Sequence, residues 1–179
     1  MKAIAVYCGA NAGASPVYAD AARALGRALA ERNIALVYGG GNVGLMGVIA
    51  DEVLRLGGEV TGVIPQALLE REVGHATLTR QFVVKDMHER KAMMSALSDA
   101  FIALPGGMGT LEELFEMLTW SQLGIHAKPV GVLNVAGFYD GLVGFIAHQQ
   151  REGFVQARHA ALMIVETEVE ALLQRLHGR

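Results

Sequence analysis

The fold is decided by one segment of the chain, residues 100–118, which reads AFIALPGGMGTLEELFEML. Its first five residues form an apolar run that is typical of a buried strand. After a glycine-rich stretch, apolar residues repeat at the spacing of a helix, at Leu111, Leu114, Phe115 and Leu118. The segment therefore predicts a strand, a tight loop and a helix in direct succession.

The loop between them has the properties of an anion-binding site. Amide N–H groups at a helix N-terminus lack intrahelical acceptors, and the helix dipole adds positive potential there. Gly106, Gly107 and Gly109 let the backbone approach a ligand closely, because no Cβ stands in the way. A simple turn needs fewer glycines. The loop is therefore predicted to bind a phosphate.

Two polar residues follow the glycines at the spacing of a capping box. Thr110 is expected as the N-cap, with Glu113 at the third helical position. The same hydroxyl can contact a phosphate, and the same carboxylate can serve either the dipole or a substrate. On a helical wheel Glu113 lies away from the apolar stripe, so its side chain is not required in the core.

Strand-like and helix-like segments alternate along the rest of the chain. Strands are expected at Ile4–Tyr7, Ala35–Tyr38, Val60–Ile64, Leu78–Val84, Ala100–Leu104, Pro129–Val135 and Ala161–Val165, and helices at Pro16–Arg32, Leu45–Leu56, Met87–Leu97, Leu111–Leu123, Tyr139–Glu152 and Glu168–Leu176. The stretch Gln66–Ala76 reads as a polar loop or short helix. This alternation predicts an α/β fold, a doubly wound, mostly parallel seven-stranded sheet with helices on both faces.

Composition narrows the class of protein. A chain of 179 residues that is 52% hydrophobic is expected to form a single domain, residues 1–179. A net charge of −3 offers no footprint for nucleic acid, and no basic run suggests a membrane surface. The single cysteine, Cys8, excludes an intramolecular disulfide, and the six histidines lack ligand-type spacing and are expected at the surface or at helix ends. No signal-peptide core is recognisable, so a cytoplasmic location is expected.

Small residues gather in three loops that follow predicted strands: Gly9–Ser15, Gly39–Gly44 and Pro105–Gly109. Ligands of such folds bind at the carboxyl ends of the strands, so these loops are expected to form one cleft. The second loop formally matches the dinucleotide fingerprint G-x-G-x-x-G, but it follows the second strand, and the next strand ends without an acidic residue. Three interpretations stay open for it: a dinucleotide site, a wall of the same nucleotide cleft, or glycines that serve only packing.

A second group of charged residues opens the helix before residue 100. Arg90 and Lys91 are two cations near the predicted phosphate loop. Alternatively they lie on a solvated face with Asp86 and Glu89 as partners, and the spacing favours neither interpretation. The methionines at positions 46, 87, 93 and 94 could line a pocket or fill the core, and we favour the core.

Together these motifs resemble the Lonely Guy family of cytokinin riboside 5′-monophosphate phosphoribohydrolases, whose members were often labelled lysine decarboxylases. The resemblance rests on Met87–Lys91 and Pro105–Glu113, supported by Tyr38–Gly47 and Leu118–Trp120, and it covers almost the whole chain. It implies a Rossmann-like homodimer that hydrolyses the N-glycosidic bond of a nucleoside 5′-monophosphate. AMP and N6-isopentenyl-AMP are the expected substrates, free base and ribose 5-phosphate the products, and neither cofactor nor metal is expected.

The resemblance also assigns roles to individual residues. It implies Arg90 and Glu113 as the catalytic pair, Gly106, Gly107, Gly109 and Thr110 as the phosphate loop, and Glu72, Lys91 and Thr119 as nucleotide contacts. Ala10 departs from the family, because many relatives have serine after Cys-Gly. A hydroxyl is therefore missing from the first loop.

Two other functions compete with this one. A lysine decarboxylase would need pyridoxal phosphate on one of four lysines, at positions 2, 85, 91 and 128, and the chain is small for such an enzyme. A non-catalytic carrier of a nucleotide or cofactor is the stronger rival, since related sheets bind ligands without converting them. A carrier has no use for a carboxylate near the sugar, so Glu113 beside Arg90 distinguishes the two.

Overall fold

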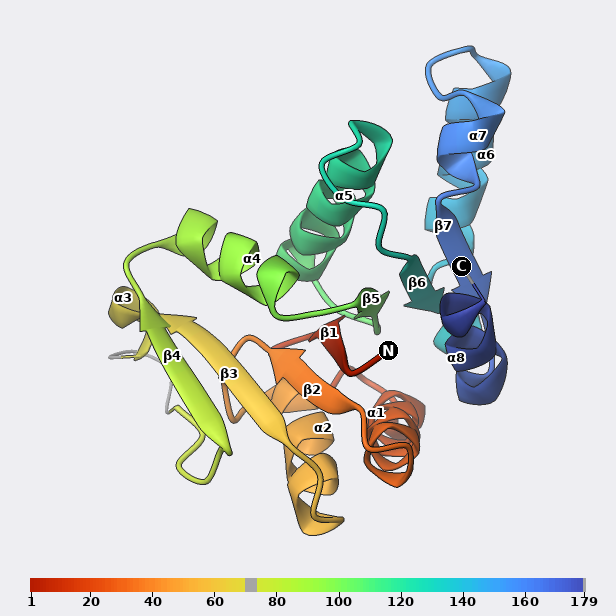
Figure 1. Ribbon diagram of the computed structural model, residues 1–179. Helices are drawn as coiled ribbons and strands as arrows, with labels where there is room; N and C mark the ends of the chain where they lie inside the picture. Colours follow the sequence, from red (N-terminus) through yellow and green to blue (C-terminus); the bar gives the residue numbers. More distant parts are fainter. Residues whose placement is uncertain (70–73, 179) are drawn as a thin grey trace.

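Seven parallel strands form a single sheet in the computed structural model, which describes residues 1–69 and 74–178. The strand order across the sheet is β4-β3-β2-β1-β5-β6-β7 (Figure 1). The strands are β1 (Ala3–Tyr7), β2 (Ala35–Tyr38), β3 (Val60–Pro65), β4 (Arg80–Val84), β5 (Ala100–Ala103), β6 (Val130–Leu133) and β7 (Met163–Glu166). All seven predicted strands and the parallel, doubly wound class are thereby confirmed.

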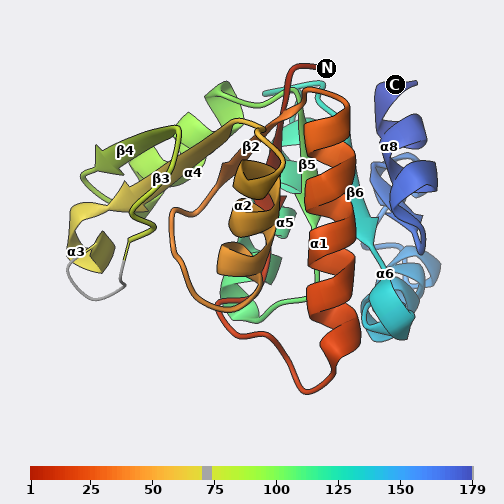
Figure 2. The same cartoon turned by 90° about the horizontal axis from the view of Figure 1, so that it is seen from below.

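Helices cover both faces of this sheet, as expected. The longer ones are α1 (Pro16–Glu31), α2 (Gly44–Arg55), α4 (Met87–Ala96), α5 (Met108–Gln122), α6 (Asp140–Arg151) and α8 (Val169–His177); the short ones are α3 (Gln66–Leu69), α7 (Ala157–Ala160) and the 3-10 turn η1 (Val135–Gly137). Figures 1 and 2 place α1, α2 and α8 on one face and α4 and α5 on the other. In the described part of the chain, no helix combines the length and apolarity needed to cross a membrane.

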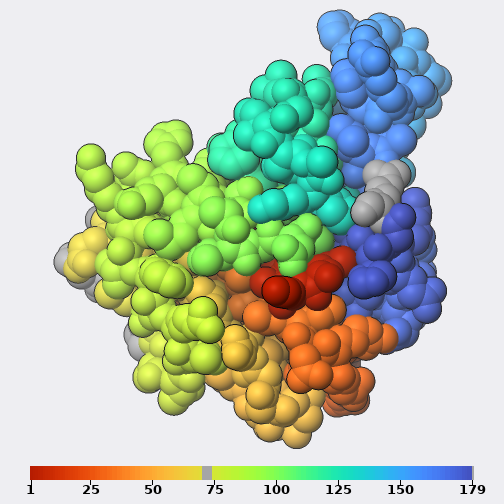
Figure 3. All heavy atoms as spheres, in the orientation of Figure 1, coloured from red at the N-terminus to blue at the C-terminus, as the bar shows by residue number. Residues whose placement is uncertain are grey.

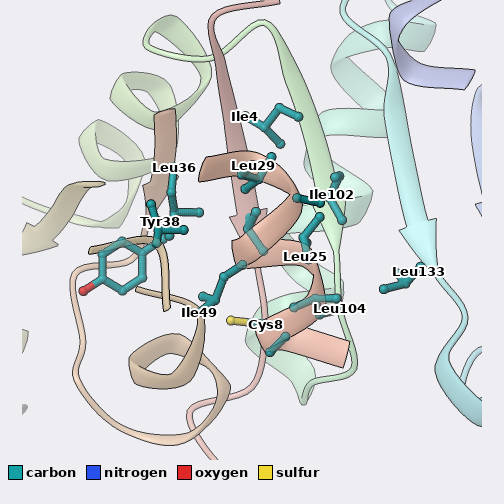
Figure 4. Close-up of a cluster of buried hydrophobic side chains, with 14 of the residues drawn as sticks. Ile4, Cys8, Leu25, Leu29, Leu36, Tyr38, Ile49, Ile102, Leu104 and Leu133 are labelled. Atoms are coloured by element: carbon teal, nitrogen blue, oxygen red, sulfur yellow. The ribbon is translucent and has the colours of Figure 1, made fainter. Parts of the chain in front are cut away.

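Two apolar layers hold the helices to the sheet. Alternate residues of a strand point to opposite faces, so Ile4 and Val6 of β1 pack under α1 and α2, whereas Ala5 and Tyr7 pack under α4 and α5. Figure 4 shows the first layer, in which side chains from β1, β2 and β5 meet Leu25 and other residues of the helices. Each fully buried Leu or Ile stabilises the fold by about 1.5–3 kcal/mol. The two layers therefore hold the sheet in place as a rigid support for the loops at its edge.

The chain reverses its direction across the sheet between β1 and β5. From β1 it winds outward to β4 and then returns to pair β5 with the other side of β1, so that Tyr7 lies beside Ala103. The loops leaving these two strands diverge to opposite faces, and such a point is where doubly wound sheets bind ligands. The amide of Gly9 donates to the carbonyl of Pro105 over 3.0 Å, which holds the two loops together at their roots.

The loop at Gly39–Gly44 serves close packing. Gly44 has φ of +59°, and a Cβ there would lie 2.3 Å from the carbonyl carbon of Ala10. The next amide, that of Leu45, donates to the carbonyl of Gly9 over 3.0 Å. The glycines thus let α2 begin directly against the loop after β1. This supports the packing interpretation for the glycines themselves, whereas the residues just after them reach the cleft.

Candidate active site

A cavity of about 390 Å³ opens at the point where β1 and β5 diverge. Its walls come from the loop after β1, from the loop after β5 with the first turns of α5, and from Leu45 and Met46 of α2. Met87 and Arg90 of α4 also line the cavity, beside Glu113. This size is typical of sites for small molecules. The first and third loops therefore share one cleft as predicted, and the second contributes only through the helix that follows it.

The phosphate loop is built differently from the predicted capping box. Helix α5 begins at Met108 with Gly107 as its N-cap, so Thr110 is the third helical residue and Glu113 lies one turn further on. The prediction of Thr110 as N-cap is wrong because Met108 and Gly109 already adopt helical geometry. The Thr110 side chain is buried instead against Gly106, where an added Cβ would lie 2.1 Å from the Thr110 hydroxyl oxygen. The amides of the first helical turn remain directed toward the cavity end of α5 without intrahelical acceptors.

Arg90 is buried and aimed at the cavity. Its guanidinium donates to the carbonyl of Gly39 over 3.3 Å and approaches Oε1 of Glu113 at 3.9 Å. The Nε of Arg90 is buried without a hydrogen-bond partner among the described residues. Of the two interpretations left open by the sequence, the structure supports a cation at the cleft. Asp86 instead caps α4, accepting from the amide of Glu89 over 2.9 Å.

Glu113 is a buried carboxylate in the wall of the same cavity. Burial raises its pKa to about 7, and the nearby Arg90 only partly opposes that effect. The helical-wheel interpretation of α5 is corrected here: the buried face carries Thr110, Glu113, Leu114 and Met117, whereas Phe115 is exposed. Glu113 can lie on this inner face of α5 because the same face also lines the cavity. A carboxyl that ionises near neutral pH can act as a base or stabilise a developing cation.

Lys91 is also buried, but its ammonium is engaged by carboxylates of α5. Its ammonium makes ion pairs with Glu112 and, at 3.0 Å, with Oε2 of Glu116. Burial lowers the pKa of Lys91, and the hydrogen bonds to these two carboxylates outweigh it, so the net shift is upward. Within the described residues of one chain, Lys91 is not part of the cavity lining.

The other predicted contacts are distributed unevenly. Ala10 lines the cavity, so the position that lacks a hydroxyl does lie in the site. Thr119 is exposed on α5 and lies outside the described lining. Glu72 lies outside the described residues. Their roles in binding stay predictions.

One methionine and one histidine differ from what the sequence indicated. Met46 and Met94 are core residues and Met93 packs against the core, as favoured, although Met46 also lines the cavity; Met87 is partly exposed and lines the cavity. His75 is buried and not at the surface, because its Nε2 is paired with Asp51 over 2.9 Å. Among the described residues, no group of three or more His, Cys, Asp or Glu side chains could hold a metal ion.

Two aromatic residues of the cavity went unpredicted. Tyr18 of α1 and Phe138 contact each other edge to face, with ring centroids 5.8 Å apart, and both line the cavity. Phe138 is placed by its neighbour Tyr139, whose hydroxyl donates to the carbonyl of Leu104 over 2.6 Å. The sequence gives no periodic signal for such a contact, since the two rings are 120 positions apart along the chain.

Comparison with known proteins agrees with the motifs that meet in this cavity. A family model described as "Possible lysine decarboxylase" matches residues 46–176. A protein of Oryza sativa subsp. japonica named "Probable cytokinin riboside 5'-monophosphate phosphoribohydrolase" is 53% identical over 97% of this chain and 78% of its own length. An Arabidopsis thaliana protein named as a cytokinin riboside 5'-monophosphate phosphoribohydrolase is 50% identical over 98% of this chain and 82% of its own.

The chain belongs to the Lonely Guy family. In this Lonely Guy protein the two sequence motifs of the family, one on α4 and one at the start of α5, meet in the wall of the cavity, where Arg90 lies beside Glu113. The Lonely Guy fold also resembles a molybdenum cofactor carrier protein of Chlamydomonas reinhardtii, with a TM-score of 0.74 and 20% identity over 99% of each chain. At that identity the likeness shows the fold alone.

Proposed function

We propose that this chain hydrolyses the N-glycosidic bond of cytokinin nucleoside 5′-monophosphates, releasing the free base and ribose 5-phosphate. The observation that carries the proposal is the pairing of Glu113 with Arg90, 3.9 Å apart, in the cavity at the N-terminus of α5. The names of the plant relatives, which are about half identical to this chain over nearly its whole length, point to the same activity. We further propose that AMP itself is a substrate.

The substrate's 5′-phosphate is assigned to the start of α5. Gly106, Gly107, Gly109 and Thr110 line the cavity there, and the first amides of the helix can donate to phosphate oxygens. Arg90 supplies a largely buried cation in the wall of the same cavity. Binding a remote phosphate provides binding energy that can orient the reacting sugar, so monophosphates are preferred to free nucleosides.

Glu113 is assigned to the reacting carbon. As the bond between C1′ and the base nitrogen breaks, its electron pair leaves with the base, and positive charge develops on the ribose ring. An ionised carboxylate stabilises that charge and accepts a proton from the water that attacks C1′. Arg90 binds the substrate and keeps part of the population of Glu113 ionised by lowering its pKa against the effect of burial.

The lysine decarboxylase described by the family model finds no support in the cavity. None of the lysines is among the lining residues of the described chain. Lys91 is bound to two glutamates, and Lys128 donates to the carbonyl of Ser95 over 2.6 Å. A carrier function would use the phosphate loop and Arg90 but leaves a costly buried carboxylate unexplained.

We also propose that the chain acts as a homodimer in the cytoplasm. Support for the dimer comes from apolar side chains that stay exposed on α5, on α6 and just beyond them: Phe115, Leu123, Ile125, Phe145 and Phe154. Figure 3 shows α6 and α7 as a projecting lobe beside α5. We infer that these exposed apolar side chains belong to an interaction surface. Such a surface suits a second copy of the chain.

Chromatography of reaction products tests the proposed function. AMP and N6-isopentenyl-AMP are each expected to yield free base and ribose 5-phosphate, with no inorganic phosphate and without added metal or pyridoxal phosphate. Adenosine has the same scissile bond but no phosphate, so its turnover should fall by orders of magnitude. Glu113→Gln keeps the shape but loses the charge, and its kcat should fall about a hundredfold or more while nucleotide binding persists.

Two outcomes would contradict the proposal at different points. If neither monophosphate releases base while both bind, the carrier function is favoured. If adenosine is cleaved as fast as AMP, the loop at the start of α5 is not a phosphate site.

A further inference from the structure

Helix α5 brings three carboxylates together within little more than one turn: Glu112, Glu113 and Glu116. Two cations of α4 face them. Arg90 approaches Glu113, whereas Lys91 contacts Glu112 and Glu116. The five side chains thus divide into a pair, Arg90 and Glu113, and a triad in which Lys91 lies between Glu112 and Glu116; Glu112 of the triad also lines the cavity.

We propose that Lys91 is a positioning residue for the reaction proposed above, which neutralises Glu112 and Glu116 so that Glu113 can carry its negative charge at the reaction centre. Lys91 therefore acts through Glu113 and does not touch the nucleotide. The effect on catalysis rests on the proposed function, whereas the arrangement of the charges is independent of it.

The geometry of Lys91 supports this role. Its side chain is 6% exposed, and its ammonium is engaged by two carboxylates from successive turns of α5. Glu112 and Glu116 are four residues apart on the helix, a spacing at which like charges repel. A single buried ammonium between them removes that repulsion and joins α4 to α5. Its donors are thereby occupied by carboxylates of the protein, and Lys91 itself is not among the described lining residues of the cavity.

Glu113 is sensitive to this triad because the same charges reach it. From α4 it faces Arg90 and Lys91, which lower its pKa, and from its own helix it faces Glu112 and Glu116, which raise it. From the end of β1 it faces Tyr7, and from the loop that follows it faces Cys8; both stay neutral because burial raises the pKa of each. Removal of Lys91 would take away a positive charge that lowers the pKa of Glu113. The negative charges of Glu112 and Glu116, which raise that pKa, would then be unbalanced, so it would rise above its value of about 7.

The pH dependence of kcat/KM for base release from N6-isopentenyl-AMP tests the proposal. In Lys91→Met, which keeps a long apolar side chain, the acid limb should move to higher pH by about one unit or more. In the triple variant Lys91→Met, Glu112→Gln, Glu116→Gln, the limb should return toward its wild-type position, because the unbalanced charges are gone. The matched control is Lys85→Met, an exposed lysine outside the cluster, which should leave the limb in place.

A direct nucleotide contact by Lys91 gives a different pattern. KM would then rise at every pH in Lys91→Met, the acid limb would stay where it is, and the triple variant would not restore anything. That pattern would overturn the proposal. If Lys91→Met does not fold, the double variant Glu112→Gln, Glu116→Gln is measured in its place. It removes two negative charges that raise the pKa of Glu113, so the acid limb should move to lower pH. An unmoved limb in that variant would equally overturn it.

A second readout separates this inference from the proposed function. The carboxyl carbon of Glu113 can be titrated by NMR in protein labelled with ¹³C-glutamate, and its resonance is identified by its loss in Glu113→Gln. If the wild-type protein releases no base from either monophosphate, the proposed function fails, yet the Glu113 titration should still move to higher pH in Lys91→Met. An unchanged titration would overturn the role of Lys91 whatever the enzyme assay shows.

Discussion

At the scale of single residues, the ionisation of Glu113 controls the chemistry. Its pKa of about 7 arises mainly from burial, so near neutral pH the carboxyl is about half ionised before a substrate binds. Only the ionised form stabilises positive charge at C1′ or accepts a proton from water. We therefore expect kcat/KM for AMP to fall about tenfold per pH unit below pH 7. A profile that stays flat down to pH 5 would show that another group serves as the base.

The same shift makes Glu113 a source of instability at high pH. Its pKa is about 7 in the folded chain against 4.5 ordinarily, so folding disfavours the charged form, and stability is lost as the pH rises from 4.5 through 7. Glu113→Gln removes the titration. We expect the variant to exceed the wild type by about 1–3 kcal/mol at pH 8 and by nothing at pH 4. Melting temperatures measured across this range check the sign, and a variant less stable at pH 8 would contradict it.

Sequence reasoning identified Arg90 and Glu113 as partners but not their surroundings. The resemblance to a family placed both residues, and helical spacing placed each on its element. Burial of Glu113 was missed because a helical wheel scores apolar residues alone, and here a cavity gives a charged side chain a place on the inner face. The contact between Tyr18 and Phe138 depends on how two distant elements pack, which no local pattern records.

At the scale of elements, replacing either of two glycines near the start of α5 by alanine should have opposite effects on stability. In Gly106→Ala the new Cβ would lie 2.1 Å from the Thr110 hydroxyl oxygen, so the start of α5 must shift, at a cost of about 1–3 kcal/mol. Gly109 has nothing within 4 Å of its Cβ position and lies inside the helix. Gly109→Ala should therefore stabilise the chain by about 0.5–1 kcal/mol.

Thermal unfolding of the two glycine variants separates these effects. For a chain of this size, 1 kcal/mol corresponds to about 2–4 °C, so the melting temperature should fall in Gly106→Ala and rise in Gly109→Ala. Equal melting temperatures would show that the close approach of Thr110 to Gly106 does not constrain the loop.

The boundaries of elements were the weaker part of the sequence prediction. Helix α1 begins at Ser15 and Pro16 as predicted, because a hydroxyl cap and a proline act locally. Helix α5 begins earlier than predicted, since the packing of Thr110 against Gly106 outweighs its propensity to cap. Capping residues therefore predict where a helix begins only if no tertiary contact competes with the cap.

At the scale of the whole molecule, α6 predicts how copies of the chain associate. None of its residues is fully buried, and Phe145 is 55% exposed. Covering such a side chain with a second copy would remove apolar area from water at about 25 cal/mol per Å². We expect light scattering to report about twice the chain mass of 19.1 kDa, and Phe145→Glu to lower it toward one chain.

The control for this prediction is Phe82→Glu on β4, at the opposite edge of the sheet, where the side chain is also partly exposed. That variant should keep the wild-type mass. A wild-type protein that scatters as a single chain at micromolar concentration would exclude the dimer.

The class and order of the fold were accessible from the sequence because apolar runs and helical spacing alternate so regularly. Continuous runs such as Ala100–Leu104 indicate strands covered on both faces, and these occupy the centre of the sheet. The exposed apolar residues of α5 and α6 could not be separated from core residues in the same way. Their spacing is that of any amphipathic helix. Only the folded structure shows which of these apolar side chains stay exposed.

The placement of the cavity between β1 and β5 has a consequence for the order of folding. The backbone amide of Lys2 binds the carboxylate of Asp99, 97 positions away, and the two strands that frame the cavity lie equally far apart in the chain. Closing so long a loop costs entropy that local contacts do not offset, so this pairing forms late. A folding chain can therefore acquire its helices and the sheet from β1 to β4 before it has any place for a ligand. Nucleotide capture would thus report that β1 and β5 have paired.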